Sequence, residues 1–410
     1  MSLIVQKYGG SSVADTEKIK RVARRVADTR NSGHQVVVVI SALGDTTDRL
    51  VGLAREICER PPEREMDMLL ATGEQISVAL LSMAMHSLRQ DAISFTGAQV
   101  GIVTDNAHTK AKIIDIKAER ILEELAAGKV VIVAGFQGVS LDNNITTLGR
   151  GGSDTTAVAL AAALKADLCE IYTDVEGVFT ADPRVVPEAR KLDSISYDEM
   201  LEMAATGARV MQLRSIEFAR NYGVVIHVRS SFTDSEGTWI RDEPERMEKA
   251  VISGVTHDTG EAKVTLKGVP DRPGIAAHLF RRLAEANINV DMIIQNVSDN
   301  AQTDITFTLG VDDLPRARDI LAVVAEELDA RSYDCDEDIA KVSLVGAGMK
   351  THPGVAADMF EALAEEGINI EMISTSSIKI SCVVRKAEVE RAVKAIHRRF
   401  DLERGMVQHD

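Results

Sequence analysis

Paired cysteines and an excess of positive charge are both absent from this sequence, and each absence excludes a class of protein. The cysteines lie far apart along the 410 residues, with no spacing suited to zinc or to a redox motif. They are interpreted as reduced thiols of a cytosolic protein. The formal net charge of −16 argues against binding to nucleic acid or to an anionic membrane surface. The four cysteines are Cys58, Cys169, Cys335 and Cys382.

Long apolar runs are also missing. None approaches the roughly 18 residues that a membrane span needs, and the amino terminus lacks the pattern of a signal peptide. We therefore expect a cytoplasmic protein with neither a nucleic-acid nor a membrane partner. A length of 410 residues corresponds to two or three domains, each with enough chain to bury a core.

The first half of the chain alternates between strand and helix patterns. Strands are predicted over 3–8, 35–41, 130–134, 168–172 and 224–228, and helices over 14–29, 68–88, 117–127, 155–166, 197–205 and 211–222. This alternation predicts an α/β domain with a doubly wound, mostly parallel sheet. The polar stretch 230–243, followed by Pro244, is typical of a linker, so we place the end of this domain at residue 245.

Two glycine-rich turns follow strands of this predicted sheet. The first is Gly9-Gly10-Ser11-Ser12, and the second is the stretch 147–154, Thr-Leu-Gly-Arg-Gly-Gly-Ser-Asp. Glycines let a backbone turn sharply and approach a ligand closely. Ser153 and Asp154 are residue types that cap helices, so a helix is predicted to begin there, and a helix start attracts anions. The first turn is not a Walker loop, because no Gly-Lys-Ser/Thr closes it.

The second half of the chain contains an internal repeat. Residues 273–293 and 353–373 align at a constant offset of 80 positions, and each copy has the pattern strand, Pro-Gly turn, amphipathic helix, Ile-Asn, strand. Two such copies indicate a paired regulatory module, although a duplicated structural unit without a ligand has the same pattern. Matching pairs include Pro273/Pro353, Gly274/Gly354, Phe280/Phe360, Leu283/Leu363, Asn289/Asn369 and Met292/Met372.

Taken together, these motifs resemble those of the aspartate kinase family, in the family's order. The resemblance rests on stretches 7–13 and 147–154 and on Tyr172-Thr173-Asp174-Val175 and Asp182-Pro183-Arg184. The repeat resembles the family's tandem ACT domains. The resemblance implies an amino-acid kinase fold over 1–245, followed by two α+β ACT-like domains over 246–331 and 332–410. Because the sequence ends after the second repeat, it resembles the monofunctional enzymes of the family and not the fusions with homoserine dehydrogenase.

The reaction implied by the resemblance is transfer of the γ-phosphoryl group of ATP to the side-chain carboxylate of L-aspartate, which gives 4-phospho-L-aspartate. That carboxylate is ionised at pH 7, so the reaction needs no general base. Catalysis should rest on positioning and on positive charge around the phosphoryl group. Mg²⁺ is expected to arrive with ATP, held by phosphates and waters, and we predict no protein metal site.

The resemblance also assigns roles to residues. Lys7 and Asp154 are the expected catalytic residues, with Asp154 holding Lys7, capping its own helix, or both. Arg150 suits the α-carboxylate of aspartate through a bidentate contact. Glu74 suits the ammonium group, although a glutamate near the predicted start of a helix is also favoured by the helix dipole alone. The expected substrate-binding residues are Ser41, Thr47, Glu74, Arg150, Gly151, Gly152 and Ser153.

The nucleotide is expected to bind beside the first glycine-rich turn. Arg209 stands where the family pattern has a lysine, which keeps the charge but changes its geometry. The expected ATP-binding residues are Lys7, Gly9, Gly10, Ser11, Thr173, Asp174, Asp182, Arg184, Arg209 and Val210.

The ACT-like repeats are expected to bind lysine, threonine or both as feedback inhibitors. The resemblance further implies a homo-oligomer formed through the ACT domains, and an internal start at Met247 that would produce an ACT-only subunit is an additional hypothesis. The expected effector-binding residues are Asp271, Gly274, Ile275, Asn289, Val290, Asp291, Gln295, Asn369, Ile370 and Ser376.

Three alternatives remain beside this interpretation. Another amino-acid kinase, such as glutamate 5-kinase or acetylglutamate kinase, is disfavoured by the tandem repeat and by the motifs around Lys7 and Arg150. A catalytically inactive amino-acid sensor would need only the repeat. A dinucleotide-dependent dehydrogenase is the weakest alternative, since no Gly-x-Gly-x-x-Gly follows a strand.

Overall fold

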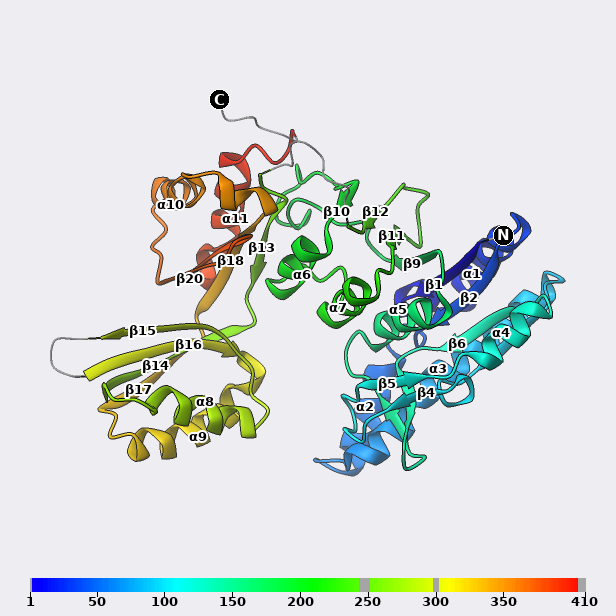
Figure 1. Ribbon diagram of the computed structural model, residues 1–410, viewed down its shortest axis with the longest axis horizontal. Coiled ribbons are helices and arrows are strands. Elements are labelled where there is room, and N and C mark those ends of the chain that lie inside the picture. The colour runs from blue at the N-terminus through cyan, green and yellow to red at the C-terminus, as the bar shows by residue number, and fades with distance from the viewer. Residues whose placement is uncertain (1, 243–250, 298–301, 405–410) are drawn as a thin grey trace. The chain divides into compact units, whose positions relative to one another are not determined.

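The computed structural model describes residues 2–242, 251–297 and 302–404 (Figure 1). Met247, the residue of the internal-start hypothesis, lies outside these residues. The chain divides into two compact units. The first unit comprises Met1–Phe179, Lys191–Ala205 and Arg209–Met247, and the second comprises Thr180–Arg190, Thr206–Ala208 and Glu248–Asp410. Each unit is described by itself below.

The first unit is built on an eight-stranded sheet with strand order β10-β12-β11-β9-β1-β2-β6-β3. The pairing of β11 with β12 is antiparallel, and the other pairings of this sheet within the described residues are parallel. The prediction of a doubly wound, mostly parallel sheet is therefore confirmed. The strands are β1 (Leu3–Tyr8), β2 (Gln35–Ile40), β3 (Ala92–Phe95), β6 (Val130–Ala134), β9 (Leu168–Thr173), β10 (Ser194–Ile195), β11 (Ile226–Ser230) and β12 (Thr238–Ile240).

Helices cover both faces of this sheet because its central strands are apolar on both sides. Every side chain from Val36 to Ile40 and from Val130 to Ala134 is buried. Helices α1 (Thr16–Asn31) and α3 (Glu63–Ser87) pack on one face, and α5 (Gly152–Leu164) packs against β1, β2 and β9 and against α7 (Leu213–Tyr222). The remaining helices of this unit are α2 (Thr46–Ile57), α4 (Glu119–Ala126) and α6 (Tyr197–Ala205).

Helix α3 begins five residues before the predicted start at residue 68, at Glu63. Its length and apolar composition alone would allow it to cross a membrane. In the first unit, however, α3 packs on the sheet, with Leu70, Val78 and Leu81 in the hydrophobic core. This helix also buries two carboxylates, which are described with the candidate site.

A second, smaller sheet in this unit was not predicted. Its strand order is β5-β4-β7-β8, and β8 leads directly into the second glycine-rich turn. The strands have three or four residues each, which is too short for a hydrophobic period to be recognised. Strand β12 is a further difference, because it lies inside the predicted linker 230–243. The small-sheet strands are β4 (Ile102–Thr104), β5 (Ile113–Ile116), β7 (Gln137–Ser140) and β8 (Ile145–Thr147).

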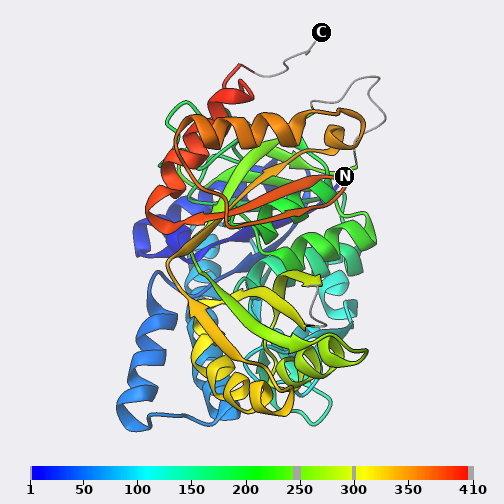
Figure 2. The same cartoon turned by 90° about the vertical axis from the view of Figure 1, so that its left-hand side faces the viewer.

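The second unit contains two four-stranded antiparallel sheets, each with two helices (Figures 1 and 2). In the first, α8 (Ile275–Glu285) and α9 (Leu314–Glu327) share one apolar core with the sheet β15-β16-β14-β17. In the second, α10 (Val355–Glu365) and α11 (Val389–Arg399) pack on the sheet β13-β18-β20-β19. The prediction of two α+β units with the same element order is confirmed.

The two sheets do not follow the order of the chain. Strand β13 (Gly254–Asp258) pairs with β18 (Ile339–Val345), and β17 (Ser332–Asp336) pairs with β14 (Glu261–Pro270). The first sheet is thus inserted between two strands of the second, and the segments 246–331 and 332–410 do not coincide with the sheets. The remaining strands are β15 (Val290–Val297), β16 (Gln302–Gly310), β19 (Met372–Thr375) and β20 (Lys379–Arg385).

Candidate active site

The first glycine-rich turn lies at the carboxyl edge of the large sheet, directly after β1. The backbone N–H of Gly9 donates to the carbonyl of Tyr172 at 3.3 Å, and the N–H of Gly44 donates to the carbonyl of Gly10 at 3.1 Å. A Cβ on Gly10 would lie 3.0 Å from the carbonyl oxygen of Ala42, which is backbone and cannot move aside easily. Close packing between the turns after β1 and β2 therefore favours glycine at position 10.

Lys7 stands at the end of β1 and forms an ion pair with Asp154. The two side chains are 12% and 9% exposed, and Lys7 Nζ lies 2.6 Å from Asp154 Oδ1. A Cβ on Gly9 would lie 3.5 Å from Lys7 Nζ, so the ammonium group sits beside the first glycine-rich turn. This arrangement places a partly buried cation next to backbone that a polyanion can approach.

Asp154 does not cap its helix, which corrects one of the two predicted roles. Helix α5 begins at Gly152, and its N-cap is Gly151, which makes no side-chain capping bond. Asp154 is in the first turn of α5, and among the described residues its buried Oδ1 has Lys7 as its polar partner. The predicted start at Ser153 or Asp154 was wrong because Gly151, with φ of 69°, fills the capping position.

The second glycine-rich turn is held at Leu148 by one backbone contact and one side-chain contact. The N–H of Leu148 donates to the carbonyl of Phe136 at 2.8 Å, and the guanidinium of Arg214 donates to the carbonyl of Leu148 at 3.1 Å. Gly149 has a φ of 77°, a conformation that glycine adopts without strain. Arg150 is exposed and makes no hydrogen bond or ion pair with the part of the chain that the structure describes. Its guanidinium is therefore free to bind an anion.

Asp67, which was not predicted as a site residue, lies on α3 and holds the start of this turn through Thr147. Its fully buried carboxylate accepts hydrogen bonds from Thr147 Oγ1 at 2.5 Å, His108 Nδ1 at 2.6 Å and the N–H of Thr109 at 3.0 Å. One aspartate on α3 therefore joins the second glycine-rich turn to the loop between β4 and β5. Asp67 lies just before the predicted helix start at residue 68 and two residues after Glu65, so no pattern in the sequence singled it out.

Glu74 lies in the middle of α3 and is only 3% exposed. Its Oε1 accepts a hydrogen bond from the N–H of Ala42 at 3.0 Å, next to Ser41. Its Oε2 is buried and has no hydrogen-bond partner among the described residues. Burial raises the pKa of Glu74 to about 7, against the opposing effect of the Ala42 N–H. The helix-dipole explanation is wrong, because Glu74 is far from the start of α3.

Several predicted nucleotide-site residues meet at the same edge of the sheet. Thr173 ends β9 next to Asp174, and its carbonyl accepts from the N–H of Ser231 at 2.8 Å. Ser231 Oγ lies 2.5 Å from Ser12 Oγ, which connects the end of β11 to the first glycine-rich turn. Ser231 was not predicted. The structure therefore brings Gly9, Gly10, Ser11, Thr173 and Asp174 to one edge.

The four remaining expected ATP-binding residues come later in the chain, between β9 and α7. Asp182 and Arg184 belong to the second unit, where Arg184 Nη2 lies 2.7 Å from Asp182 Oδ2. The hydrogen bond from Arg184, opposed by partial burial, lowers the pKa of Asp182. Arg209 and Val210 precede α7 in the first unit, and Arg209 is exposed. Binding of ATP by these four residues stays a prediction.

Within the described ranges, no group of three or more His, Cys, Asp and Glu side chains is placed to hold a metal ion.

The remaining expected substrate-binding residues lie at the ends of strands and the starts of helices in the first unit. Ser41 follows β2 and Thr47 is in the first turn of α2, while Gly151, Gly152 and Ser153 form the start of α5.

The expected effector residues lie in the turn before α8, at the start of α8, along β15 and on either side of β19. Gly274, with φ of 99°, caps α8, and the buried Ile275 is the first residue of that helix. Asp271 is exposed in the same turn. Asn289, Val290, Asp291 and Gln295 lie at or on β15, and Asn369, Ile370 and Ser376 flank β19.

Asp291 is not free in this structure, because Lys341 binds it. Lys341 lies on β18, is 1% exposed, and pairs with Glu261 of β14 and with Asp291 of β15, with 2.5 Å between Lys341 Nζ and Asp291 Oδ2. Burial disfavours the charge of Lys341, but the two carboxylates outweigh it and raise the pKa of Lys341. This cluster joins the two sheets of the second unit, and it was not predicted.

Models of known families match most of the chain. The model of the amino acid kinase family matches residues 2–230. Models of the ACT domain match residues 264–326 and 342–400. The first range covers most of the large sheet with its helices, and the other two cover most of the two sheets of the second unit, without β13 and β17.

Full-length relatives are similar over nearly the whole chain. An aspartokinase from Mycolicibacterium smegmatis is 56% identical over 407 residues, which cover 98% of this chain and 97% of the relative. The crystal structure of E. coli aspartokinase III in complex with aspartate and ADP is similar with a TM-score of 0.84 and 28% identity, over 97% of this chain and 99% of that one. The structure of the same E. coli enzyme in complex with lysine and aspartate is similar with a TM-score of 0.74 and 28% identity, over the same shares of both chains.

Proposed function

The chain belongs to the aspartokinase family, and from that premise we propose that it phosphorylates the side-chain carboxylate of L-aspartate with MgATP, giving 4-phospho-L-aspartate. The observation that carries the proposal is the Lys7–Asp154 pair beside Gly9 at the carboxyl edge of the parallel sheet. This edge is where sheets of this type bind ligands. The similar E. coli aspartokinase III binds aspartate and ADP, which supports the same substrates here.

Positive charge at the transferred phosphoryl group is the main requirement of this reaction. The attacking carboxylate and the triphosphate are both anionic, so their approach must be compensated by fixed cations. Lys7 supplies one such cation, and Asp154 holds its ammonium in place. The N–H groups of Gly10 and Ser11 are assigned to the phosphate oxygens, whereas that of Gly9, also expected there, donates to the carbonyl of Tyr172 in this structure. Mg²⁺ bound to the nucleotide would neutralise part of the phosphate charge, and no cluster in the described residues offers it a protein cage.

Substrate aspartate is assigned to the space near the second glycine-rich turn. Arg150, which is exposed and has no ion pair with the described residues, is assigned to the α-carboxylate. Glu74 has one carboxylate oxygen without a partner, and an ammonium group would satisfy it. Ser41 and Thr47 are assigned as hydroxyl ligands because they follow β2 next to Ala42, which Glu74 contacts.

Feedback regulation is assigned to the second unit. The similar E. coli aspartokinase III also binds lysine, and this chain contains two ACT domains. We assign lysine, threonine or both as effectors, with binding by the turns before α8 and α10 and by β15 and β19. An effector must bind one arrangement of the protein better than another, or it changes nothing. Assembly through the ACT domains, a cytoplasmic location, and a role as the first step of lysine, threonine and methionine biosynthesis complete the proposal.

A hydroxamate assay tests this proposal directly. Purified protein with MgATP is incubated with aspartate, glutamate or N-acetylglutamate in the presence of hydroxylamine, which traps the acyl phosphate. Only aspartate should yield hydroxamate, and adding lysine and threonine, singly and together, should reduce the yield. Turnover of glutamate or N-acetylglutamate instead would favour another amino-acid kinase. Effector binding without turnover of any acid would favour an inactive amino-acid sensor.

A further inference from the structure

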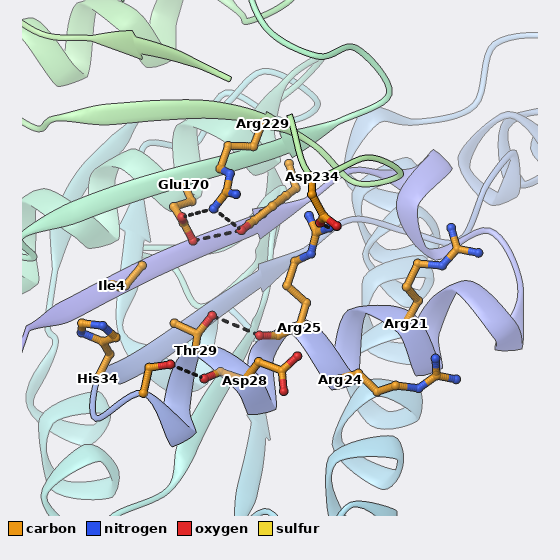
Figure 3. A pocket seen from close by; sticks show the side chains of 12 residues that line it. Ile4, Arg21, Arg24, Arg25, Asp28, Thr29, His34, Glu170, Arg229 and Asp234 are labelled. Carbon is orange, nitrogen blue, oxygen red and sulfur yellow. Dashed lines mark hydrogen bonds and ion pairs between the residues drawn. The ribbon is translucent and has the colours of Figure 1, made fainter. Parts of the chain in front are cut away.

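A cavity of about 540 Å³ lies in the first unit, on the face of the large sheet that carries α1 (Figure 3). Its lining includes four arginines, three of them from α1 and one from β11. The ion pair of Lys7 is on the other face. Side chains alternate along β1, and Ile4, which lines the cavity, points away from the side to which Lys7 points. The cavity is therefore separate from the candidate active site.

Two of the arginines are held rigidly by the fold. The guanidinium of Arg25 lies over the Tyr172 ring at 4.9 Å and donates to the carbonyl of Ser230 at 2.9 Å. The guanidinium of Arg229 donates to Glu170 at 3.1 Å, and Glu170 is itself buried and bound by Gln6. A guanidinium fixed in this way loses little conformational entropy when it binds an anion.

The other two arginines make no direct contact with a carboxylate of the described residues, although Arg24 attracts the Glu17 carboxylate electrostatically. Arg21 and Arg24 are exposed on α1 and make no hydrogen bond or ion pair with any residue that the structure describes. Arg21 lies about one helical turn before Arg25, and Arg24 is next to Arg25 in the sequence. The three side chains therefore project from one side of α1. In Figure 3, Arg25 points toward Asp234, while Arg21 and Arg24 have no dashed contact.

Carboxylates in the cavity do not cancel this charge. Glu170 is engaged by Arg229, and Asp234 is engaged by Arg25 at 3.2 Å. The Asp234 side chain is 98% exposed, and an ion pair to a fully exposed carboxylate contributes little. A ligand anion can therefore replace Asp234 on Arg25 at small cost. Asp28 is the one remaining carboxylate of the lining, against the unpaired Arg21 and Arg24.

We propose that this cavity is a second anion site, which binds a ligand carrying at least two phosphoryl groups. Planar guanidinium groups match the oxygens of phosphate in pairs, and four of them around one cavity suit several phosphates better than a single small anion. In a chain with a net charge of −16, such a local excess of unpaired arginine is not explained by the overall charge. The ligand replaces Asp234 on Arg25 and recruits Arg21 and Arg24.

Equilibrium dialysis with radiolabelled pyrophosphate in magnesium-free buffer tests this site. The full-length Lys7→Gln protein is used, because that substitution weakens binding at the nucleotide site while keeping a hydrogen-bond donor for Asp154. We expect about one equivalent of pyrophosphate per chain. The added double substitution Arg21→Gln/Arg24→Gln should weaken this binding by about tenfold or more, since hydrogen bonds to charged groups contribute strongly. Circular dichroism of each variant confirms folding.

Matched controls separate a built site from diffuse surface charge. Arg55→Gln/Arg60→Gln removes the same charge from two exposed arginines that line no part of the cavity, and it should leave pyrophosphate binding unchanged. Asp234→Asn should tighten binding, because it removes the competing carboxylate, whereas Glu59→Gln, an equal change of charge at an exposed position, should not. Absence of saturable binding would overturn the proposal, and so would equal effects of the cavity variants and their controls.

Discussion

Lys7 in the first unit and Lys341 in the second are both largely removed from solvent, and their surroundings differ. Lys7 pairs with one carboxylate, that of Asp154, and its ammonium lies beside Gly9. Lys341 pairs with two carboxylates and is 1% exposed. A cation with one partner and a glycine turn at its open side retains capacity for an anionic ligand. A cation enclosed by two carboxylates is satisfied by the fold itself.

The contrast shows how the same residue type supports chemistry in one place and packing in another. Lys7 stands at the end of a strand, where backbone N–H groups also gather. Lys341 stands in the middle of β18 and connects β14 and β15 of the other sheet in the same unit. The two lysines differ in how many carboxylates they pair with and in whether a ligand can reach the ammonium group. Four predictions test or sharpen this difference.

The largest effect is expected from Lys7→Gln. Removing the cation should reduce kcat by about a thousandfold, as removal of a group that stabilises the transition state does in other enzymes. The glutamine amide can still donate to Asp154, so the midpoint of thermal unfolding should change little. Steady-state assays measure kcat, and scanning calorimetry measures the unfolding midpoint. Titration calorimetry with lysine and threonine should show that effector binding remains. An enzyme with near-normal kcat would remove Lys7 from the catalytic role.

Lys341→Met should have the opposite effect: the free energy of unfolding should fall, while kcat should be retained. Glu261 and Asp291 would be left without their shared cation, and breaking a buried pair in this way costs about 3 kcal/mol. Urea unfolding followed by circular dichroism measures the change. Lys394→Met, on an exposed face of α11, is the matched control and should change stability by less than about 0.5 kcal/mol. A loss of kcat at unchanged stability would contradict the structural role.

The contrast extends to the two buried carboxylates of α3. Asp67 is satisfied by Thr147, His108 and Thr109, whereas Glu74 has one oxygen without a partner. Asp67→Ala should therefore act through the loop that it holds, raising the KM for aspartate by roughly tenfold because Arg150 follows Thr147 in the same turn. The KM for MgATP should change less. Glu63→Gln, at an exposed position of the same helix, is the control. Equal increases in both KM values would contradict an action limited to the second glycine-rich turn, and a lower kcat with unchanged KM values would point to general unfolding.

The parts of the fold that were predictable have strong local patterns. Strands such as β2 and β6 are continuous apolar runs, and the glycine turns after β1 and before α5 are conspicuous in the sequence. The parts that were missed depend on distant partners. Strands β13 and β17 join sheets that are remote in sequence, and strands of three residues such as β4 have no period to recognise.

Site residues divide in the same way. Lys7, Asp154 and the glycines belong to continuous motifs, so their meeting at one edge follows from the parallel sheet. Asp67 and Lys341 are isolated in sequence, and their importance depends on which groups the fold places around them. Helix α3 was predicted to begin at residue 68, but it begins at Glu63. An error of a few residues in a helix boundary moved Glu74 away from the first turn, where the helix dipole acts, toward the middle of the helix.

The smallest effect, and the one that follows from the unsatisfied oxygen of Glu74, is a pH dependence of aspartate binding. The pKa of Glu74 is raised to about 7 by burial, so its carboxyl group is neutral below that pH and charged above it. The substrate ammonium requires the charged form, and the side-chain carboxylate of aspartate stays ionised throughout. The KM for aspartate should therefore fall by up to about tenfold between pH 6 and pH 8, while the KM for MgATP stays nearly constant.

Glu74→Gln separates this origin from others. The amide cannot ionise, so the KM for aspartate should be high and independent of pH over the same range. Glu65→Gln, an exposed position of α3, should keep the wild-type profile. If the wild-type KM does not vary with pH, or if it varies equally in Glu74→Gln, another group controls binding of the ammonium. Glu74 would then resemble Asp67, as a buried carboxylate that serves the fold through its contact with Ala42.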